Sequence, residues 1–310
     1  MKHVSVLLNE CIEGLNIKED GIYVDGTLGR GGHSSEILKR IPNGQLICFD
    51  KDLKAIEESA PRLHAIGDNV ILIHNGFMNL KEELHQRGIQ KIDGLLLDLG
   101  VSSPQFDEAE RGFSYRFDAP LDMRMDTSQS FSAYQLVNEY TYEQLVSVFL
   151  RYGEDPFAKQ VARKIEQARL KKPVETTFEL VDIIKSAYPA KVLNKKGHPA
   201  KKIFQAIRIE VNNELMELEK CLEDAMDLLA VNGRICVISF HSLEDRIVKD
   251  TFKRKSSSEE VDKRIPLKAS EIEEPPFRCV NRKPILASEE ELNENNRSHS
   301  AKLRILERVK

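Results

Sequence analysis

The sequence lacks any long uninterrupted run of apolar residues. No stretch among its 310 residues approaches the roughly 20 apolar residues that a membrane-spanning helix needs. Near its start, residues 4–8 are apolar or small before polarity returns, which is too short for the apolar region of a signal peptide. We therefore expect a soluble, cytoplasmic protein.

Paired cysteines are also absent. The five cysteines include no Cys-x-x-Cys pair, and a chain of this length does not need disulfides to hold a core together. We expect reduced core thiols. A catalytic cysteine is the alternative, with Cys279 as its candidate.

An excess of positive charge is missing as well. The formal net charge is −4, which argues against a protein that coats nucleic acid. Basic residues still gather locally, with five lysines and no acid in residues 191–202 and five basic residues against one aspartate in residues 246–255. Each run fits either a phosphate-contacting face or a solvated helix face.

Short apolar runs alternate with helix-length segments in the first hundred residues. Each run is bounded by Gly, Asn or Asp, and the runs are Ile22–Asp25, Leu46–Asp50, Val70–His74 and Ile92–Asp98. This alternation is typical of a parallel sheet built from βαβ units, in which ligands bind at the carboxyl ends of the strands.

The strand pattern stops between residues 107 and 202. Three capping-box patterns there, beginning at Ser132, Thr141 and Thr176, predict helix starts. Apolar spacings of three and four over residues 204–229 then predict one long helix, ended by Asn232 and Gly233. Further strands are predicted at residues 234–240 and 301–308, with residues 256–300 mostly loop. The sequence thus predicts an α/β core of residues 1–106 and 203–310, interrupted by an all-helical insert of residues 107–202.

A glycine-rich run, Asp25-Gly-Thr-Leu-Gly-Arg-Gly-Gly-His33, follows the first predicted strand directly. Glycines let the backbone approach a ligand where a Cβ would collide, but the spacing is neither the Walker pattern nor Gly-x-Gly-x-x-Gly. Asp50, at the end of the second strand, can accept hydrogen bonds from ribose hydroxyls. Together they favour an adenosine-type ligand, either S-adenosylmethionine or a nicotinamide cofactor; a plain structural turn is the alternative.

The exit of the fourth strand distinguishes these two cofactors. It reads Asp98-Leu-Gly-Val-Ser-Ser-Pro-Gln-Phe106, and its last four residues resemble the Asp/Asn/Ser-Pro-Pro-aromatic signature of amino methyltransferases, with Gln in place of the second Pro. A conjugated exocyclic amine is a poor nucleophile, so a site that accepts hydrogen bonds from its N–H groups and holds it in line promotes methyl transfer. An ordinary strand-ending turn is the alternative.

Two further clusters allow more than one interpretation. Aromatic residues at positions 113, 115 and 117 lie among arginines, which suits stacking on a flipped or single-stranded base, although a buried segment explains the same spacing. His241, Ser242, Glu244 and Asp245 follow the strand after the insert. With no second histidine and no nucleophile elbow nearby, we expect them to line a polar pocket, and we expect no metal site.

Long stretches spread from residue 3 to residue 308 closely resemble the bacterial 16S ribosomal RNA cytosine-N4-methyltransferase family. These stretches are residues 25–34, 94–105, 110–114, 120–126, 198–200, 204–208 and 239–249. The resemblance implies a Rossmann-like class I methyltransferase core with a helical substrate-recognition insert. It also implies S-adenosylmethionine as cofactor, 16S ribosomal RNA in the small ribosomal subunit as partner, and a cytidine near the decoding centre as target.

The resemblance also assigns site residues. It implies cofactor contacts from Gly31, Gly32, His33, Asp50, Phe77, Asp98 and Gln105. We predict that Asp98, Ser103 and Pro104 orient the amine. The expected substrate-binding residues are Phe113, Arg116, Asp122, Arg124, His198 and His241.

Three other functions are weighed against this one. An N4-cytosine DNA methyltransferase shares the cofactor site, but the matches within the insert argue against it. A nicotinamide-dependent dehydrogenase has only the strand, the glycines and Asp50 in its favour. A non-catalytic RNA-binding protein with a vestigial pocket is the third. Both a monomer and a homodimer are compatible with the sequence.

Overall fold

The computed structural model describes residues 5–194, 197–257 and 274–310 of the chain. Contacts divide it into two compact units. The sheet unit comprises Met1–Gly100 and Leu215–Lys310, and the helical unit comprises Val101–Glu214. The expected borders lay at residues 106/107 and 202/203, so the residues just outside the expected insert on both sides cluster with the helical unit.

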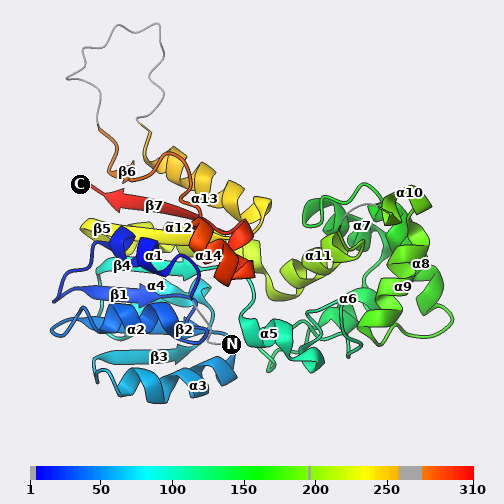
Figure 1. Cartoon of the computed structure of the whole chain (residues 1–310), viewed down its shortest axis with the longest axis horizontal. Helices are drawn as coiled ribbons and strands as arrows, with labels where there is room; N and C mark the ends of the chain where they lie inside the picture. Colours follow the sequence, from blue (N-terminus) through cyan, green and yellow to red (C-terminus); the bar gives the residue numbers. More distant parts are fainter. Residues whose placement is uncertain (1–4, 195–196, 258–273) are drawn as a thin grey trace, which may run out of the picture. The chain divides into compact units, whose positions relative to one another are not determined.

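The sheet unit contains a seven-stranded sheet in the order β3-β2-β1-β4-β5-β7-β6 (Figure 1). Its strands are β1 (Ile22–Asp25), β2 (Gln45–Asp50), β3 (Val70–His74), β4 (Ile92–Asp98), β5 (Leu229–Ser239), β6 (Phe277–Cys279) and β7 (Lys302–Arg308). The first five are parallel, and β7 runs antiparallel to both β5 and β6. The predicted Rossmann-like α/β sheet is confirmed. Because the strand order reverses between β1 and β4, their carboxyl ends flank the switch point at which such sheets bind ligands.

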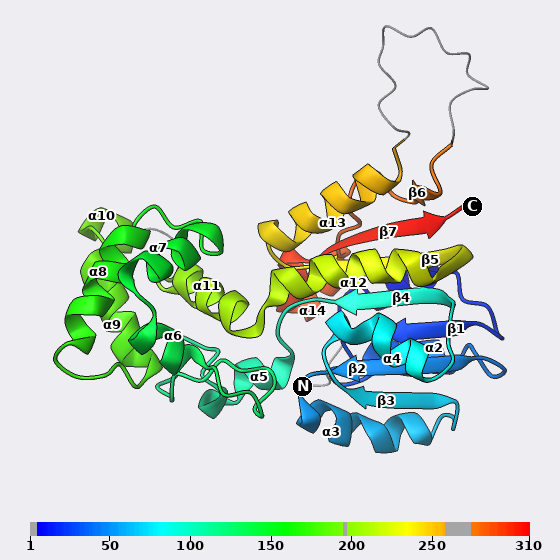
Figure 2. The ribbon, with the colours of Figure 1, turned by 180° about the vertical axis from the view of Figure 1, so that it is seen from behind.

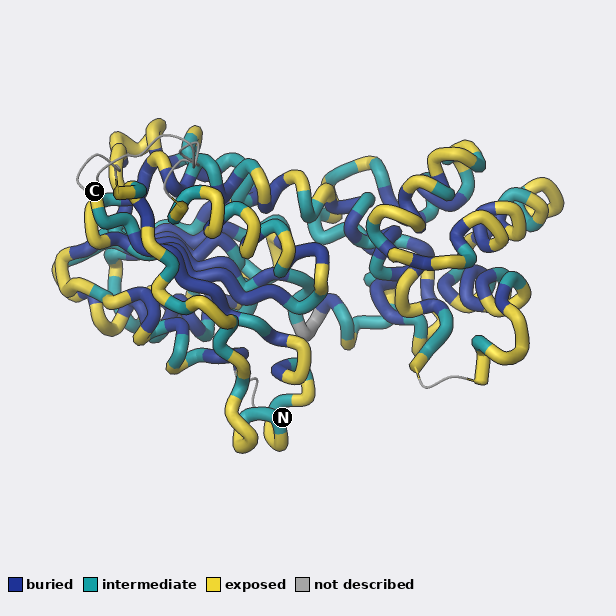
Figure 3. The backbone as a smooth tube through the Cα atoms, turned by 90° about the horizontal axis from the view of Figure 1, so that it is seen from above, coloured by how far each residue is buried: buried dark blue, intermediate teal, exposed yellow. Residues whose placement is uncertain are grey.

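Helices cover both faces of this sheet (Figures 1 and 2). One face packs on α1 (Leu8–Leu15), α2 (Gly32–Leu38) and α3 (Leu53–His64), and the other packs on α4 (Leu80–Gln86), α12 (Glu214–Leu228) and α13 (Ser242–Lys255). Strand residues alternate between these two cores: Leu46 and Cys48 of β2 join the first, and Ile47 and Phe49 join the second. Figure 3 shows the strands buried between helices whose outer turns are exposed.

The helical unit forms its own apolar core. Its helices are α5 (Ser103–Asp107), α6 (Ala133–Glu139), α7 (Tyr142–Arg151), α8 (Ala158–Arg169), α9 (Thr177–Ala187), α10 (Ala190–Leu193) and α11 (Lys201–Asn212). The predicted capping boxes at Ser132, Thr141 and Thr176 are present at the starts of α6, α7 and α9. In the described parts of residues 107–202 no strand forms beyond an isolated bridge between Pro120 and Thr176.

Two sequence expectations are wrong. The single helix over residues 204–229 is divided into α11 and α12, because Asn213 adopts a left-handed backbone with φ 52°. The apolar residues of α11, including Ile203, Phe204 and Ile207, pack in the helical unit, whereas Leu218 and Leu222 of α12 pack under the sheet. Residues 229–233 belong to β5 and do not end a helix.

The region 256–300 is only partly loop. It contains β6, a short 3-10 helix η4 (Asn296–Ser300) and α14 (Glu289–Glu294), whose cap Ser288 was not predicted. The expected loop at residues 258–273 lies outside the described residues. Among the described helices, none is long and apolar enough to cross a membrane.

Candidate functional site

The glycine-rich run forms a tight turn between β1 and α2, at the switch point of the sheet. Gly29 and Gly31 have φ of 49° and 64°, a region that suits glycine. A Cβ on Gly32 would lie 1.9 Å from Oγ of Ser5, so a side chain at this position would displace the Ser5 hydroxyl. The structure thus shows a turn at this position, and cofactor binding by the turn stays a prediction.

Two acidic side chains hold this turn and the strand ends around it. Buried Asp25 accepts hydrogen bonds from the backbone N–H of Thr27 (3.0 Å) and from Oγ of Ser34 (2.6 Å). Asp50, partly buried, accepts from the N–H of Gly29 and of Asp52, both at 2.8 Å. Burial raises the pKa of Asp25, and it raises the pKa of Asp50 to about 6.

Asp98 ends β4 on the other side of the switch point. Its backbone N–H donates to Oγ1 of Thr27 at 2.7 Å, which links the end of β4 to the glycine turn. Its Oδ1 is buried and has no hydrogen-bond partner among the residues that the structure describes. Burial raises the pKa of Asp98 to about 6, although nearby His33 lowers it. An acceptor oxygen without a donor is the feature expected of a group that receives a ligand's N–H.

His33 lies beside Asp98, with its Nδ1 3.9 Å from Oδ2 of the aspartate. Its Nε2 lies 3.0 Å from the carbonyl oxygen of Val6. Because a carbonyl only accepts, Nε2 carries a proton and donates it to that oxygen. Nδ1 is therefore the ring nitrogen that faces Asp98.

Phe77 begins the 3-10 helix η1 (Phe77–Asn79), just after β3. A Cβ on Gly26 would lie 3.2 Å from the Cβ of Phe77, so its side chain starts next to the glycine turn. The structure thus brings Gly31, Gly32, His33, Asp50, Phe77 and Asp98 to one edge of the sheet unit. Their contact with a cofactor stays a prediction.

Gln105, the remaining predicted cofactor residue, lies in α5 of the helical unit. Its Oε1 accepts a hydrogen bond from the N–H of Ser102 at 3.0 Å, which closes the turn before the helix. The helix α5 begins at Ser103, and the side chains of Ser103 and Pro104 lie outside the described part of the structure. The predicted role of these residues stays untested.

The predicted substrate residues of the helical unit have unequal accessibility. Phe113 is only 4% exposed and packs in the helical core, so the buried-segment interpretation holds for it. Arg116 is exposed. His198 stacks on Tyr115, with ring centroids 4.2 Å apart and planes 8° from parallel. Burial, with the charges of Lys185 and Arg116, lowers the pKa of His198.

Asp122 and Arg124 form a structural pair. Arg124 donates from Nε and Nη2 to the two carboxylate oxygens of Asp122, at 2.9 and 2.7 Å, and from Nη1 to the carbonyls of Thr127 and Gln129. Burial alone raises the pKa of Asp122, but the hydrogen bonds from Arg124 outweigh it and that pKa lies below its ordinary range. These contacts fold the loop before α6, and a direct substrate contact by either residue stays a prediction.

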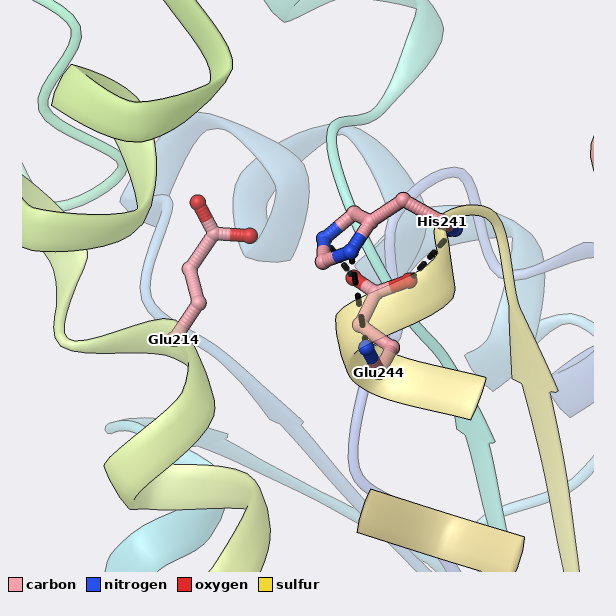
Figure 4. Close-up of side chains that lie close together, drawn as sticks. All are labelled: Glu214, His241 and Glu244. Carbon is pink, nitrogen blue, oxygen red and sulfur yellow. Dashed lines mark hydrogen bonds and ion pairs between the residues drawn. The ribbon is translucent and has the colours of Figure 1, made fainter. Parts of the chain in front are cut away.

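His241 is the N-cap of α13 in the sheet unit (Figure 4). Glu244 Oε2 accepts from the N–H groups of Phe240 and His241, and the N–H of Glu244 donates back to Nδ1 of His241 at 3.4 Å. Asp245 accepts from Arg304 at 2.7 Å and from Lys302 at 3.1 Å. This cluster caps a helix and ties it to β7, which is a structural role that the sequence alone did not reveal.

Some contributors were missed by sequence reasoning. Thr27 connects Asp25 to Asp98, and its Asp-x-Thr spacing, an Asx-turn pattern, was a usable signal. Tyr115 itself belongs to the aromatic residues that were expected to stack, but its pairing with His198, 83 positions away, follows from no local pattern. Cys11, Cys48, Cys221 and Cys236 are buried, and burial raises the pKa of each thiol, as expected of core cysteines.

Known proteins resemble the chain over its whole length. It is 56% identical over 309 residues to the ribosomal RNA small subunit methyltransferase H of Exiguobacterium sibiricum, covering 100% of this chain and 99% of that protein. Solved structures with weaker likeness include a putative rRNA methylase from Clostridium thermocellum (14% identity, TM-score 0.45, 99% and 100% of the two chains covered). Another is a putative methyltransferase from Streptococcus mutans in complex with SAH (12% identity, TM-score 0.44, 99% of both chains). Residues 1–309 match the MraW methylase family, and the chain belongs to this family of S-adenosylmethionine-dependent methyltransferases.

Proposed function

We propose that this protein transfers a methyl group from S-adenosylmethionine to the N4 amine of a cytidine in 16S ribosomal RNA, near the decoding centre. Ribosomal RNA of the small subunit is named as the substrate of the 56% identical relative. The choice of an exocyclic amine rests on this chain's own residues. The observation that carries it is the buried, unpartnered Oδ1 of Asp98 at the switch point of the sheet.

The residues around the glycine turn fit the cofactor. A side chain at Gly32 would displace Ser5, and Gly31, which is buried, has the left-handed backbone from which α2 starts. Asp50 is fixed by two backbone N–H groups, and its remaining lone pairs can accept from ribose hydroxyls. When bound, S-adenosylmethionine supplies an electrophilic methyl group on a sulfonium centre.

Asp98 has two tasks in this proposal. As a carboxylate it accepts a hydrogen bond from one N–H of the amine, which turns the nitrogen lone pair away from the ring and toward the methyl group. Forming the N–C bond would break the bond between the methyl group and the sulfonium sulfur, leaving a neutral thioether, and the amine, now positively charged, would lose a proton. Asp98, with a pKa of about 6, can accept that proton and release it to water.

Ser103 and Pro104 are proposed as the other members of the amine-orienting set. The Ser hydroxyl and the carbonyls of the loop are hydrogen-bond acceptors for the second N–H of the amine. Arg116 and His198 are proposed to contact the RNA from the helical unit, as an exposed cation and as part of an aromatic stack. Gln105 is proposed as a further cofactor contact.

The test is transfer of a tritiated methyl group to three substrates in parallel: small ribosomal subunits, naked 16S RNA and DNA. The modified base is then identified by mass spectrometry. We expect label on an RNA cytidine as N4-methylcytidine. Label confined to DNA, or to another atom, contradicts the proposal. Cofactor binding without transfer to any substrate favours the non-catalytic RNA-binding alternative.

Cofactor choice is tested separately by thermal unfolding. A ligand that binds only the folded state raises the midpoint of unfolding. S-adenosylhomocysteine should raise it and NAD should not. A shift with NAD alone would support the dehydrogenase alternative.

A further inference from the structure

A small cavity in the helical unit lies outside the residues discussed so far. Its volume is about 130 Å³, and it lies between α7 and the side chain of Glu210 on α11. Tyr140, Gln144, Ser147 and Arg151 contribute to it from positions three or four residues apart, so they share one face of the α7 segment. At this size, well below the roughly 300 Å³ minimum typical of drug-sized ligands, the cavity suits one planar ring system.

Glu210 provides the only acidic side chain among the residues lining the cavity. Its Oε1 accepts the hydroxyl of Tyr140 at 2.8 Å. Burial and the adjacent Glu210 raise the pKa of Tyr140, so the phenol remains a donor that holds the carboxylate in place. The other oxygen of Glu210, Oε2, has no partner among the described residues. A fixed carboxylate oxygen is a strong acceptor for N–H groups.

The rest of the lining supplies donors and aromatic surface. Gln144 uses its Oε1 to accept from the N–H of Thr141 at 2.8 Å, which leaves its NH₂ group as a donor. The guanidinium of Arg151 lies 5.2 Å from the centroid of the Tyr152 ring, at the rim. Tyr140 and Tyr152 contribute ring atoms to the lining, although the Tyr140 ring also stacks on Phe131, with centroids 5.5 Å apart, and the Tyr152 ring on Arg151. Aromatic ring surface is the usual partner of an unstacked base.

We infer that this cavity binds a guanine base. Guanine carries two adjacent N–H groups, N1–H and N2–H₂, beside an acceptor O6. Oε2 of Glu210 matches one of the two donors, the remaining lone pair of Oε1 beside the Tyr140 hydroxyl matches the other, and the NH₂ group of Gln144 matches the acceptor. Arg151 at the rim is placed to contact a phosphate, because its planar guanidinium binds phosphate oxygens well.

A simple ammonium ligand fits this cavity less well. Aromatic rings and a carboxylate do attract ammonium groups, but the cation of Arg151 at the rim opposes a second positive charge. The occupant is a guanosine of a single-stranded RNA. The choice of RNA as the source of the guanine rests on the proposed function. A free guanine nucleotide offers the same base, so the two sources are separated experimentally.

Isothermal titration calorimetry of the full chain tests the inference with two sets of probes. The first set is 5′-GMP, 5′-IMP, 5′-AMP, 5′-CMP and 5′-UMP, and the second is the RNA hexamers UUUGUU and UUUUUU. Among the mononucleotides we expect GMP to bind tightest. Of the two hexamers we expect UUUGUU to bind more tightly than UUUUUU. IMP lacks the N2 amine. If GMP binds, we therefore expect the affinity for IMP to be about tenfold lower than that for GMP.

Glu210→Gln is the matching protein variant. The amide oxygen still accepts from Tyr140, so we expect the fold to be kept, while the second acceptor becomes a donor and guanine affinity falls about tenfold. Glu143→Gln, an exposed glutamate of α7 outside the cavity lining, is the control and should bind like the parent. Arg151→Gln should weaken binding of both hexamers equally and keep the preference for guanine.

The outcomes separate cleanly. Binding of GMP alone assigns the site to a free nucleotide, and binding of UUUGUU alone assigns it to an RNA strand. No guanine preference in either set, or an unchanged preference in Glu210→Gln, overturns the inference. Methyl transfer to 16S RNA, measured on the same preparation, reports on the proposed function independently, since guanine binding needs no turnover.

Discussion

Replacing Asp98 by Asn should make the protein more stable and inactive at the same time. Burial raises the pKa of Asp98 from 3.8 to about 6, so the folded state holds this carboxylate at a free-energy cost at neutral pH. That rise corresponds to at most about 3 kcal/mol. Because the side chain is 26% exposed, water reduces the cost, and we expect about 1–2 kcal/mol.

The sign of the pH dependence follows from proton binding. Between pH 3.8 and about 6 the folded state holds the Asp98 proton more tightly than the unfolded state does. The destabilisation is therefore fully present above pH 6 and decreases as the pH falls toward 3.8. An asparagine cannot ionise, so the stability gained by Asp98→Asn should be largest at pH 8 and about half as large at pH 5.

Equilibrium urea unfolding of both proteins at pH 8 and pH 5, without cofactor, measures this difference. Asp245→Asn is the control with the opposite sign. Hydrogen bonds from Arg304 and Lys302 overcome the effect of burial and lower the pKa of Asp245, so losing its charge should destabilise the protein at pH 8. The reasoning is refuted if Asp98→Asn is less stable than the parent at pH 8, or if its gain is the same at both pH values. Near-normal methyl transfer by Asp98→Asn or Asp98→Ala would exclude a direct role in catalysis.

Three further predictions follow from the same contacts. At pH values below 6, the affinity for S-adenosylhomocysteine, measured by calorimetry, should decrease. The reason is that the pKa of Asp50 is about 6 and its protonated form is a poorer acceptor. The Asp50→Asn variant should lose this pH dependence. Gly31→Ala and Gly88→Ala both place a side chain at positive φ, so each should lower the stability measured by thermal unfolding by about 1–2 kcal/mol. Only Gly31→Ala should also weaken cofactor binding. Arg124→Ala should cost about 1–3 kcal/mol in urea unfolding, because its hydrogen bonds hold the loop before α6, whereas exposed Arg116→Ala should be nearly neutral.

The sheet could be predicted from the sequence because its signals are local. Four strands of the first hundred residues and three capping boxes each depend on a few consecutive residues, and all of them form. The division of the predicted long helix has a different cause. Its apolar spacing continues through Asn213, but the side chains on either side pack in two separate cores, and periodicity does not report which core a residue joins.

The site was predicted less completely than the fold. The positions of residues that end parallel strands, such as Asp50 and Asp98, were predictable because the carboxyl ends of such strands meet at one edge, while their contact with a cofactor stays a prediction. Phe113 was ambiguous, because alternating aromatic residues suit both a core and a stacking surface, and only tertiary packing decides between them. The guanine cavity gave no sequence signal, since Glu210 and Tyr140 are 70 positions apart.

Asp98 and Ser103 are separated by only four residues of chain. The chain passes from the sheet unit to the helical unit between Gly100 and Val101, only two residues after Asp98 and two before Ser103. Five residues of extended chain span at most about 18 Å, so any motion of the units must keep Asp98 and Ser103 within that reach. We predict that inserting residues after Gly100 should impair methyl transfer more than cofactor binding, because the proposed amine-orienting residues Asp98 and Ser103 would no longer be held this close by the chain.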